Sequence, residues 1–414
     1  MRDFSRSVCA ALTCATVVLM LSACGGGSSG TSSPMPQTNT TGGGSETTMS
    51  TQSSTVTAQG FTTAVDTDTS NLDDNDYDND DSVLKKLDDQ RTIGSTVDPI
   101  NGDQNPYGLD VAKSDNGKIK AGDLVICNFN NNNAGGNVQG QGTTIVALHP
   151  HVGSTPLHIA QDPSLLGCDA LALAPDDTIW AAAFVANDNP LVSPSGMLLT
   201  TLPGGPWHGP FGQAFAPHPG FYGSVAAFYE TNAGDGSIVR INIRPGKPFS
   251  FDVIATGFPI NHGAPGSILG PSGLQYDARR DRLFIVDGAN NAVYVLRHVS
   301  SIPAHGLSVD PNGTSFDGPF RHRARVVFIG SPLNGPISSA VLHDGHLAIG
   351  NTTDPTGKNL IVEITTHGKV LYVRNVDTGN AGAIFGMVAT GRDIYDQKLY
   401  YNNDNDNTLR VLTK

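Results

Sequence analysis

The sequence predicts an all-β fold, a six-bladed β-propeller of four-stranded antiparallel blades that follows a disordered tether. A pattern of strands and polar turns recurs six times between residues 91 and 414, at about 54 residues per unit, close to the length of a propeller blade. With 48 Gly, 26 Pro and only 15% charged residues, the composition is that of a turn-rich β protein. No amphipathic helix pattern extends beyond about three turns.

The clearest unit lies at residues 280–296. Residues 283–286 and 293–296 are short apolar runs, and the segment DGANN separates them. Gly accepts positive φ and Asp and Asn bond to their own backbone, so this segment is typical of a hairpin turn. Because the runs do not alternate with polar residues, we expect both faces of the sheet to be covered.

The other five units repeat this order of turn, strand, amide-rich loop and strand. The expected second strands are, in chain order, residues 124–127, 179–182, 224–228, 283–286, 347–349 and 399–401. Other units have a fourth strand, such as 370–373, but the last unit ends with the chain.

The missing fourth strand has a counterpart near the start of the domain. The segment RTIGS at 91–95 resembles VFIGS at 327–331, which precedes the fifth unit. We therefore expect residues 91–95 to complete the last blade and close the ring, which leaves few exposed strand edges. A seven-bladed ring or a pair of β-sandwiches is the alternative.

The first 23 residues have the pattern of a lipoprotein signal peptide. Arg2 and Arg6 precede an apolar stretch at 8–23 that is too short to span a bilayer comfortably. The segment LSAC ending at Cys24 resembles the lipobox of bacterial lipoproteins, which implies cleavage before Cys24 and acylation of that residue, including palmitate. Gly25 resembles the outer-membrane sorting pattern, so we expect an anchor in the outer membrane of the cell envelope, facing the periplasm or the cell surface. An ordinary secretory signal with an incidental cysteine is the alternative.

Residues 24–90 are expected to be a disordered tether. Residues 25–60 are almost all Gly, Ser, Thr, Gln and Pro, and residues 66–89 carry an acidic run. The spacing of Asp74, Asp76 and Asp78 invites an EF-hand interpretation, but Asn79 and Lys85 stand where such a loop needs Gly and Glu. The net charge of −13 argues against a nucleic acid partner.

A family resemblance rests on the fourth unit. Pro271-x-Gly273-Leu274, followed by LFIVDGANNAVYVL at 283–296, resembles the NHL-repeat propellers. In architecture the domain is also similar to gluconolactonase-like hydrolases, which hold a divalent cation in the channel, and an NHL-type peptidylglycine lyase uses His-bound zinc. His208 and His262 lie in comparable loops, but no third zinc ligand accompanies them.

The loops that lead into the inner strands and those between second and third strands are expected to meet on one face, the upper face. The ligand or cation candidates on this face are Asn128, Asn130, Asn232, Asp287, Asn290, Asn351, Asn402, His208 and His262. Their oxygen atoms suit Ca²⁺, another divalent cation or a polar ligand. The alternative is that tight turns simply need Asn, Asp and Gly. Carboxylates near the channel are few, namely Asp110, Asp169, Asp277 and Glu230.

These patterns predict a lipid-anchored extracytoplasmic propeller that binds a partner protein or a small polar ligand at its upper channel face. The alternative is a divalent-cation-dependent, lactonase-like hydrolase or lyase that uses the central channel. Cys127 and Cys168 are placed to form a disulfide between neighbouring blades, which an oxidising compartment would favour; two buried thiols are the alternative.

Overall fold

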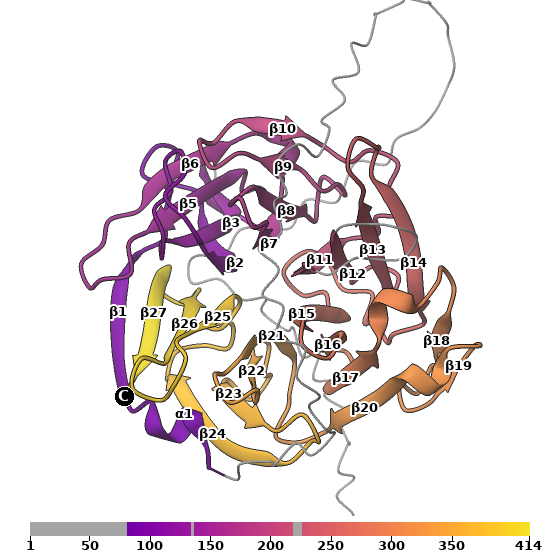
Figure 1. Ribbon diagram of the computed structural model, residues 1–414. Helices are drawn as coiled ribbons and strands as arrows, with labels where there is room; N and C mark the ends of the chain where they lie inside the picture. Colours follow the sequence, from indigo (N-terminus) through magenta and orange to yellow (C-terminus); the bar gives the residue numbers. More distant parts are fainter. Residues whose placement is uncertain (1–80, 134–135, 218–225) are drawn as a thin grey trace, which may run out of the picture.

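The computed structural model describes residues 81–414, apart from 134–135 and 218–225. Its strands form six sheets around a central axis, as Figure 1 shows. The predicted six-bladed propeller is confirmed, and neither the seven-bladed ring nor the pair of sandwiches is found. The expected signal peptide, Cys24 and residues 25–80 of the tether lie outside the described residues. No helix in the described part of the chain is long and apolar enough to cross a membrane.

Each blade begins with its innermost strand and runs outward (Figure 1). Blade one comprises β2 (Gln104–Val111), β3 (Leu124–Asn133), β5 (Thr144–Leu148) and β6 (Leu157–Gln161), with β4 (Gly136–Val138) paired to the upper end of β3. Blade two comprises β7 (Cys168–Leu173), β8 (Ile179–Ala183), β9 (Leu191–Val192) and β10 (Leu198–Thr200). Blade three comprises β11 (Pro210–Ala216), β12 (Ala226–Asn232), β13 (Ser237–Ile243) and β14 (Ser250–Thr256).

The second half of the ring follows the same plan. Blade four comprises β15 (Pro271–Asp277), β16 (Arg282–Asp287), β17 (Ala292–Arg297) and β20 (Ala324–Ile329). Blade five comprises β21 (Pro336–Val341), β22 (Leu347–Asn351), β23 (Asn359–Ile364) and β24 (Val370–Asp377). Blade six comprises β25 (Met387–Thr390), β26 (Lys398–Asn403), β27 (Thr408–Thr413) and β1 (Asp89–Ser95). An insertion in blade four contains β18 (Leu307–Val309), which pairs parallel with β14, and β19 (Phe316–Asp317).

The N-terminal strand closes the ring, as the sequence predicts. β1 runs antiparallel to β27, with Arg91 opposite Val411. Residues 83–88, which the sequence assigns to the tether, are folded: α1 (Val83–Lys86) precedes β1, and Leu84 and Leu87 are fully buried in a cluster shared by blades five and six. The folded domain therefore starts several residues before residue 91.

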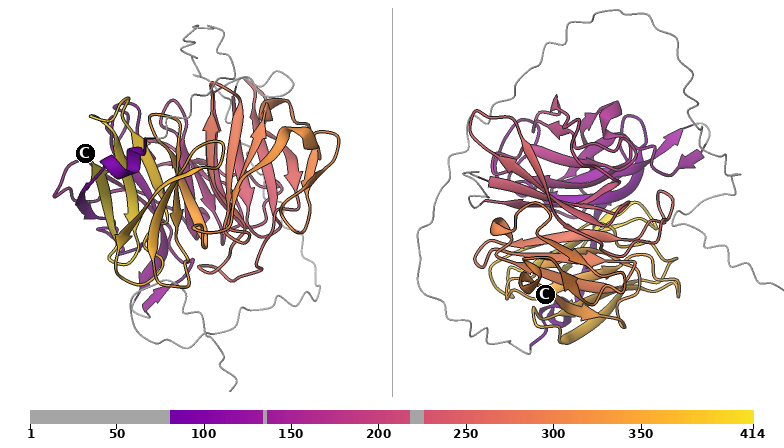
Figure 2. Two further views of the ribbon diagram at one scale, coloured as in Figure 1. Left: turned by 90° about the horizontal axis from the view of Figure 1, so that it is seen from below. Right: turned by 90° about the vertical axis from the view of Figure 1, so that its right-hand side faces the viewer.

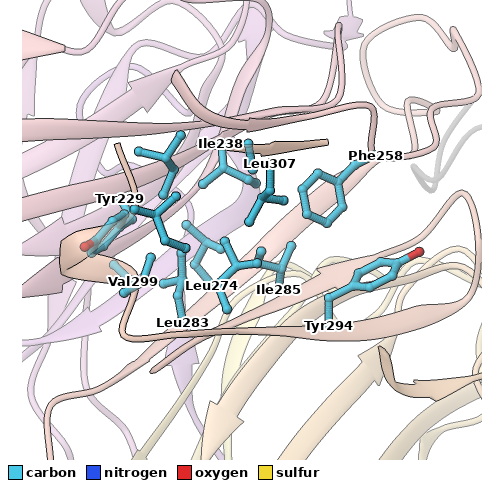
Figure 3. Close-up of a cluster of buried hydrophobic side chains, with 14 of the residues drawn as sticks. Tyr229, Ile238, Phe258, Leu274, Leu283, Ile285, Tyr294, Val299 and Leu307 are labelled. Carbon is cyan, nitrogen blue, oxygen red and sulfur yellow. The ribbon is translucent and has the colours of Figure 1, made fainter. Parts of the chain in front are cut away.

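The core fills the spaces between neighbouring blades. Figure 3 shows one cluster in which Ile238 and Tyr229 of blade three pack against Leu274 and Ile285 of blade four. Strands β16 and β17 are buried along nearly their whole length, as the continuous apolar runs predict. The two side views in Figure 2 show the blades stacked face to face. Burial of both faces of each inner sheet positions the inner strands around the channel.

Polar ties also join neighbouring blades at the upper face. In blade two Asn187, at φ 54°, accepts the N–H of Gly209 at 2.8 Å and donates to the Trp207 carbonyl at 2.9 Å, both in blade three. Asn291, at φ 51°, accepts the N–H of Gly335 at 2.7 Å, and Asn407, at φ 53°, accepts that of Asn105 at 2.7 Å. Asn tolerates the left-handed region better than other non-glycine residues, so a turn residue of blades two, four and six links each to the next blade.

A disulfide links blades one and two. Cys127 of β3 and Cys168 at the start of β7 are bonded, with a Cα–Cα distance of 5.4 Å. This spacing lies within the range that a disulfide requires. The bond therefore joins the second strand of one blade to the inner strand of the next.

Candidate functional site in the central channel

Four of the upper-face amides, Asn128, Asn232, Asn351 and Asn402, lie in strands rather than in loops, and they are buried. Asn128 and Asn402 belong to β3 and β26, while Asn232 and Asn351 end β12 and β22. Their NH₂ groups donate to backbone carbonyls, for example Asn351 to Pro332 at 2.8 Å; the others bond Thr96 (from Asn128), Pro206 (from Asn232), and Tyr107 and Gly108 (from Asn402). These contacts hold loops and inner strands in place, which is the structural alternative that the sequence left open.

The remaining upper-face candidates also form hydrogen bonds within their own blades. The Asn130 side-chain oxygen accepts the N–H of Gly140 at 3.1 Å. Asp287 accepts the N–H of Asn290 at 3.0 Å, and burial raises the pKa of Asp287 to about 7. The Asn290 amide donates to the Tyr294 hydroxyl at 3.0 Å. The structure therefore shows these residues shaping their own hairpins.

The two histidine candidates do not form a metal centre with other residues that the structure describes. His208 is exposed, and its Nε2 lies 3.8 Å from a carboxylate oxygen of Asp235. His262 is exposed in a loop at φ 54°. Neither belongs to the one three-residue group of metal-ligating side chains found in the described chain.

An aromatic plug narrows the upper end of the channel. Tyr107 stacks between Phe129 and Phe385, with ring centroids 4.3 Å and 3.7 Å away, and Phe211 and Ile337 join the same cluster. The space within the plug is about 10 Å³, no more than a single water molecule needs. The upper face therefore does not offer the open channel that the sequence leads us to expect.

Below the aromatic plug, glycine residues let neighbouring inner strands approach each other closely around the channel. A Cβ atom on Gly212 would lie 1.7 Å from the carbonyl oxygen of Ser272, so no other residue fits there without displacing backbone. Gly108, Gly273 and Gly386 occupy matching places in their own inner strands. The Gly of the Pro-x-Gly pattern is thus explained by blade packing around the axis.

A small polar chamber lies below the plug. It measures about 80 Å³, and its walls include Asp169, Gln213, Ser338 and Ser339. Asp169 takes the position in blade two that aromatic residues take in blades one, three and six, and it is only 3% exposed. Neither of its carboxylate oxygens has a hydrogen-bond partner among the residues that the structure describes. Burial, and secondly the charge of Glu230, raises the pKa of Asp169 well above its ordinary value.

Glu230 stands beside this chamber. One of its carboxylate oxygens accepts hydrogen bonds from the amides of Asn189 and Gln213, the latter at 2.9 Å, while the other has no partner in the described part of the chain. Burial raises the pKa of Glu230 to about 8, against the opposing effect of these hydrogen bonds. Two buried acidic groups thus lie in and beside the chamber, Asp169 and Glu230. A proton or a cation that neutralises them must reach them through the channel.

The large cavity opens at the opposite, lower end of the channel. Its volume is about 750 Å³, and it is formed by the ends of inner strands and by the turns between first and second strands. Its charged and polar walls include Asp110, Lys113, Gln275, Asp277, Arg279, Arg280, Arg282, His343, Asp344 and His346. Phe215 and Phe284 add aromatic surface. This is the range of volumes that small-molecule sites occupy.

Asp344, His346 and Glu363 at the cavity edge form the three-residue group with metal-ligating side chains. His346 Nδ1 lies 2.9 Å from Asp344 and 3.0 Å from Glu363. Burial lowers the pKa of His346, but the hydrogen bonds with Asp344 and Glu363 outweigh it and raise that pKa to about 9. Glu363 also accepts the N–H groups of Val83 and Leu84. A charged imidazole between two carboxylates is an ion-pair network, and His346 Nδ1 would have to lose its proton before it could bind a metal.

Sequence reasoning identified Asp110, Asp169, Asp277 and Glu230 near the channel but missed the lower-face turns. The signal was present in the segment ARRDR at 278–282, which concentrates Arg at the turn before β16. Polar amides drew attention to the opposite face, although their abundance there reflects turn and strand-end geometry.

Comparison with protein-family models finds no match, and comparison with curated proteins finds none either. Solved structures of similar fold include virginiamycin B lyase from Staphylococcus aureus, at 18% identity over 79% of this chain and 85% of that chain, with a TM-score of 0.45. A candidate gluconolactonase matches at 14% identity over 78% and 91%, with a TM-score of 0.47. The PQQ-bound aldose sugar dehydrogenase from Streptomyces coelicolor matches at 17% identity over 78% and 98%, with a TM-score of 0.49. Similarity at this level assigns no activity to the chain.

Proposed function

We propose that this chain is a lipid-anchored extracytoplasmic propeller that binds a small polar ligand in the lower cavity of its channel. The observation that carries the proposal is the cavity of about 750 Å³ at the lower end, set against the aromatic plug at the upper end. The ligand site is thus moved from the upper face, where the sequence places it, to the lower face. A partner protein would have to present its own polar group to the same cavity.

The proposed anchor is supported by the sequence alone. The signal-like segment covers residues 1–23, the motif LSAC covers residues 21–24, and a Gly- and Ser-rich stretch follows Cys24. Two or more acyl chains make a stable anchor. Cys24→Ser should leave an uncleaved precursor or a protein released from membranes. A variant that is processed normally and still partitions fully with membranes would contradict the lipobox interpretation.

Blocking the cavity tests the binding proposal. Ala389 lines the lower cavity and is partly exposed, and it also packs against the core cluster between blades five and six. Ala389→Trp should therefore narrow the site at some cost in stability, and its melting curve without ligand shows whether it still folds. The matched control is Ile100→Trp, because Ile100 is 68% exposed on the loop before β2 at the upper face. In a small-molecule screen by thermal shift, hits should be lost in Ala389→Trp and retained in Ile100→Trp. Hits that are retained in Ala389→Trp and lost in Ile100→Trp would place the site at the upper face.

A second candidate function is a divalent-cation-dependent hydrolase or lyase, and Asp169 is the observation that favours it. A buried carboxylate without a partner is costly. The same chamber is lined by the hydroxyl oxygens of Ser338 and Ser339, which have no hydrogen-bond partner within the described ranges. Oxygen ligands of this kind suit Ca²⁺ or another hard cation, which would polarise a carbonyl or phosphoryl group. These residues fit such a cation in chemistry, with room for few additional waters.

Metal analysis separates the two functions. One equivalent of metal in purified protein, lost in Asp169→Asn, together with EDTA-sensitive turnover of a lactone or ester, would establish the enzyme. Ser338→Ala serves as a variant with a weaker expected effect, because a hydroxyl is a poorer ligand than a carboxylate. Protein that binds its ligand in EDTA and turns over none of these substrates would favour binding alone.

A further inference from the structure

The chain concentrates positive charge in one region although it is acidic as a whole. Its formal net charge is −13, with 25 Lys and Arg residues. Seven of these lie within the 47 residues from 279 to 325, namely Arg279, Arg280, Arg282, Arg297, Arg321, Arg323 and Arg325. Three of the seven, Arg279, Arg280 and Arg282, line the lower cavity.

The cationic side chains in the cavity wall come from different blades. Lys113, after the inner strand of blade one, donates to the carbonyls of Leu173 and Ala174 at 2.5 Å and 3.2 Å, which leaves its charge without a bonded carboxylate. Arg282, in blade four, contacts Asp277 at 2.8 Å and 3.1 Å. Blade one and blade four are separated by two blades in the ring, so cations face the cavity from nearly opposite sides.

Arg279 and Arg280 lie at the rim of the same wall. Both are exposed, in the turn between β15 and β16. Arg280 lies 3.8 Å from Asp277, the carboxylate that Arg282 already contacts. Arg279 makes no side-chain hydrogen bond or ion pair with any residue in the described ranges 81–133, 136–217 and 226–414. Asp277 is therefore shared by the guanidinium groups of Arg280 and Arg282, and that of Arg279 lies in the same turn.

More arginine side chains lie behind the cavity wall. Arg282 of β16 lies opposite Arg297 of β17, and β17 pairs with β20, which carries Arg325. Burial lowers the pKa of Arg325, and the charges of Arg297 and Arg282 lower it further. Arg325 donates to the carbonyl of Thr366 at 2.8 Å, and Thr366 lines the cavity. Arg297 likewise donates to a carbonyl, that of His322, at 3.0 Å. Carbonyl partners satisfy the donors but do not neutralise the charge.

The carboxyl groups in the cavity wall do not balance these cations. They are Asp110, Asp277 and Asp344. Burial raises the pKa of Asp110, although Lys113 opposes this effect, and Asp344 is engaged by His346 at 2.9 Å. The cavity therefore holds an excess of positive charge in a concave site, where the field on a ligand is strongest.

We propose that the lower cavity selects a small organic anion, a carboxylate or a phosphate ester, whose charged group contacts Arg279 and Arg280. This inference rests on the proposed function, since it names the class of ligand for the same cavity. The planar guanidinium fork matches both carboxylate and phosphate oxygens. The partly exposed aromatic ring of Phe215 would contact the uncharged part of the ligand.

Calorimetric titration of the intact chain in detergent tests the inference, with glucuronate, glucose 6-phosphate and glucose as probes. We expect the anions to bind and glucose to bind at least tenfold more weakly, because hydrogen bonds to charged groups are among the stronger ones. A preference for glucuronate identifies a carboxylate and a preference for the sugar phosphate identifies a phosphate ester. Raising the salt concentration should weaken anion binding.

Charge variants show whether the cavity arginines are responsible. Arg279→Gln/Arg280→Gln should weaken anion binding about tenfold or more. The control Arg91→Gln/Arg392→Gln removes the same charge from exposed positions outside the cavity wall and should leave binding unchanged. Equal effects of the two double variants, or equal affinity for glucose and both anions, would overturn the inference.

Ala389→Trp distinguishes the failure of this inference from the failure of the proposed function. If a probe is blocked by Ala389→Trp but does not respond to the arginine changes, the cavity binds ligand and the anion inference is wrong. If anion binding survives Ala389→Trp, the site lies outside the cavity and both conclusions fail. If none of the three probes binds, the anion inference is overturned for this ligand class, and the uncharged members of the thermal-shift screen decide the proposed function.

Discussion

The backbone N–H of Leu84 donates to the carboxylate of Glu363 at 2.9 Å, and this bond spans 279 positions of the sequence. The same carboxylate accepts the N–H of Val83 at 3.0 Å and the hydroxyl of Ser82. It is fully buried. Glu363 therefore caps α1 and fastens the end of the tether to blade five.

We expect Glu363→Ala to lower the free energy of unfolding by about 3–5 kcal/mol, because it leaves buried donors without their acceptor and takes from the charged His346 one of its two carboxylate partners. Urea denaturation followed by tryptophan fluorescence gives this value. The control is Asp406→Asn, which removes an exposed partner of Arg410 and should cost about 1 kcal/mol or less. A cost for Glu363→Ala no larger than that of the control would contradict the proposed role in fastening the tether.

His346 makes stability depend on pH in the alkaline range. Its pKa rises from an ordinary 6.5 to about 9 in the folded chain, so the folded state holds a proton that the unfolded state has lost. Its contribution is complete below pH 6.5 and disappears as the pH rises through about 9. The decline in unfolding free energy between pH 7 and 9 should be shallower in His346→Gln, while the exposed His151→Gln should follow the wild type.

Glu230 adds a separate dependence of the same sign. Burial raises the pKa of this carboxyl from 4.5 to about 8, so folding favours its protonated form. The stabilising effect is complete below about pH 4.5 and is lost as the pH rises to 8. Glu230→Gln keeps the neutral shape, and we expect it to be more stable than the wild type at pH 9 by about 1–3 kcal/mol. Denaturation in EDTA, which excludes a bound cation, measures this; lower stability at pH 9 would be the contrary result.

The disulfide between Cys127 and Cys168 closes a segment with a sequence separation of 41. The chain-entropy model gives a stabilisation of about 4 kcal/mol. Cys127→Ala/Cys168→Ala should lower the unfolding free energy by up to this amount, and reduction of the wild type should have a similar effect. Alkylation and mass spectrometry of exported, non-reduced protein should find neither cysteine labelled; two labelled thiols would exclude the bond in the cell.

Two substitutions of Asn187 separate the stabilising effect of its inter-blade hydrogen bonds from the cost of backbone strain. Asn187→Ala removes hydrogen bonds to Trp207 and Gly209 and places a residue with a Cβ but no polar group at φ 54°, so we expect a loss of about 2–3 kcal/mol. Asn187→Gly loses the same bonds without the strain and should be about 1 kcal/mol more stable than Asn187→Ala. Equal thermal denaturation curves for the two variants would show that strain plays no part.

The elements that depend on local chemistry could be predicted from the sequence. Continuous apolar runs such as 283–286 specified strands covered on both faces, the segment DGANN specified their hairpin, and the echo of 327–331 in 91–95 identified the strand that closes the ring. Turn chemistry and hydrophobic periodicity act over a few residues, so they can be read along the chain.

Which end of the channel is open follows from long-range packing, which the sequence does not show. Tyr107, Phe211 and Phe385 lie far apart in the sequence, and their meeting at the axis closes the upper end. The same ring geometry brings Lys113 and Arg280 to one lower cavity, leaves Asp169 without a partner, and uses the upper-face amides to bond backbone carbonyls. Which side chains converge depends on the register and tilt of six blades, and contacts over such distances leave no local pattern in the sequence.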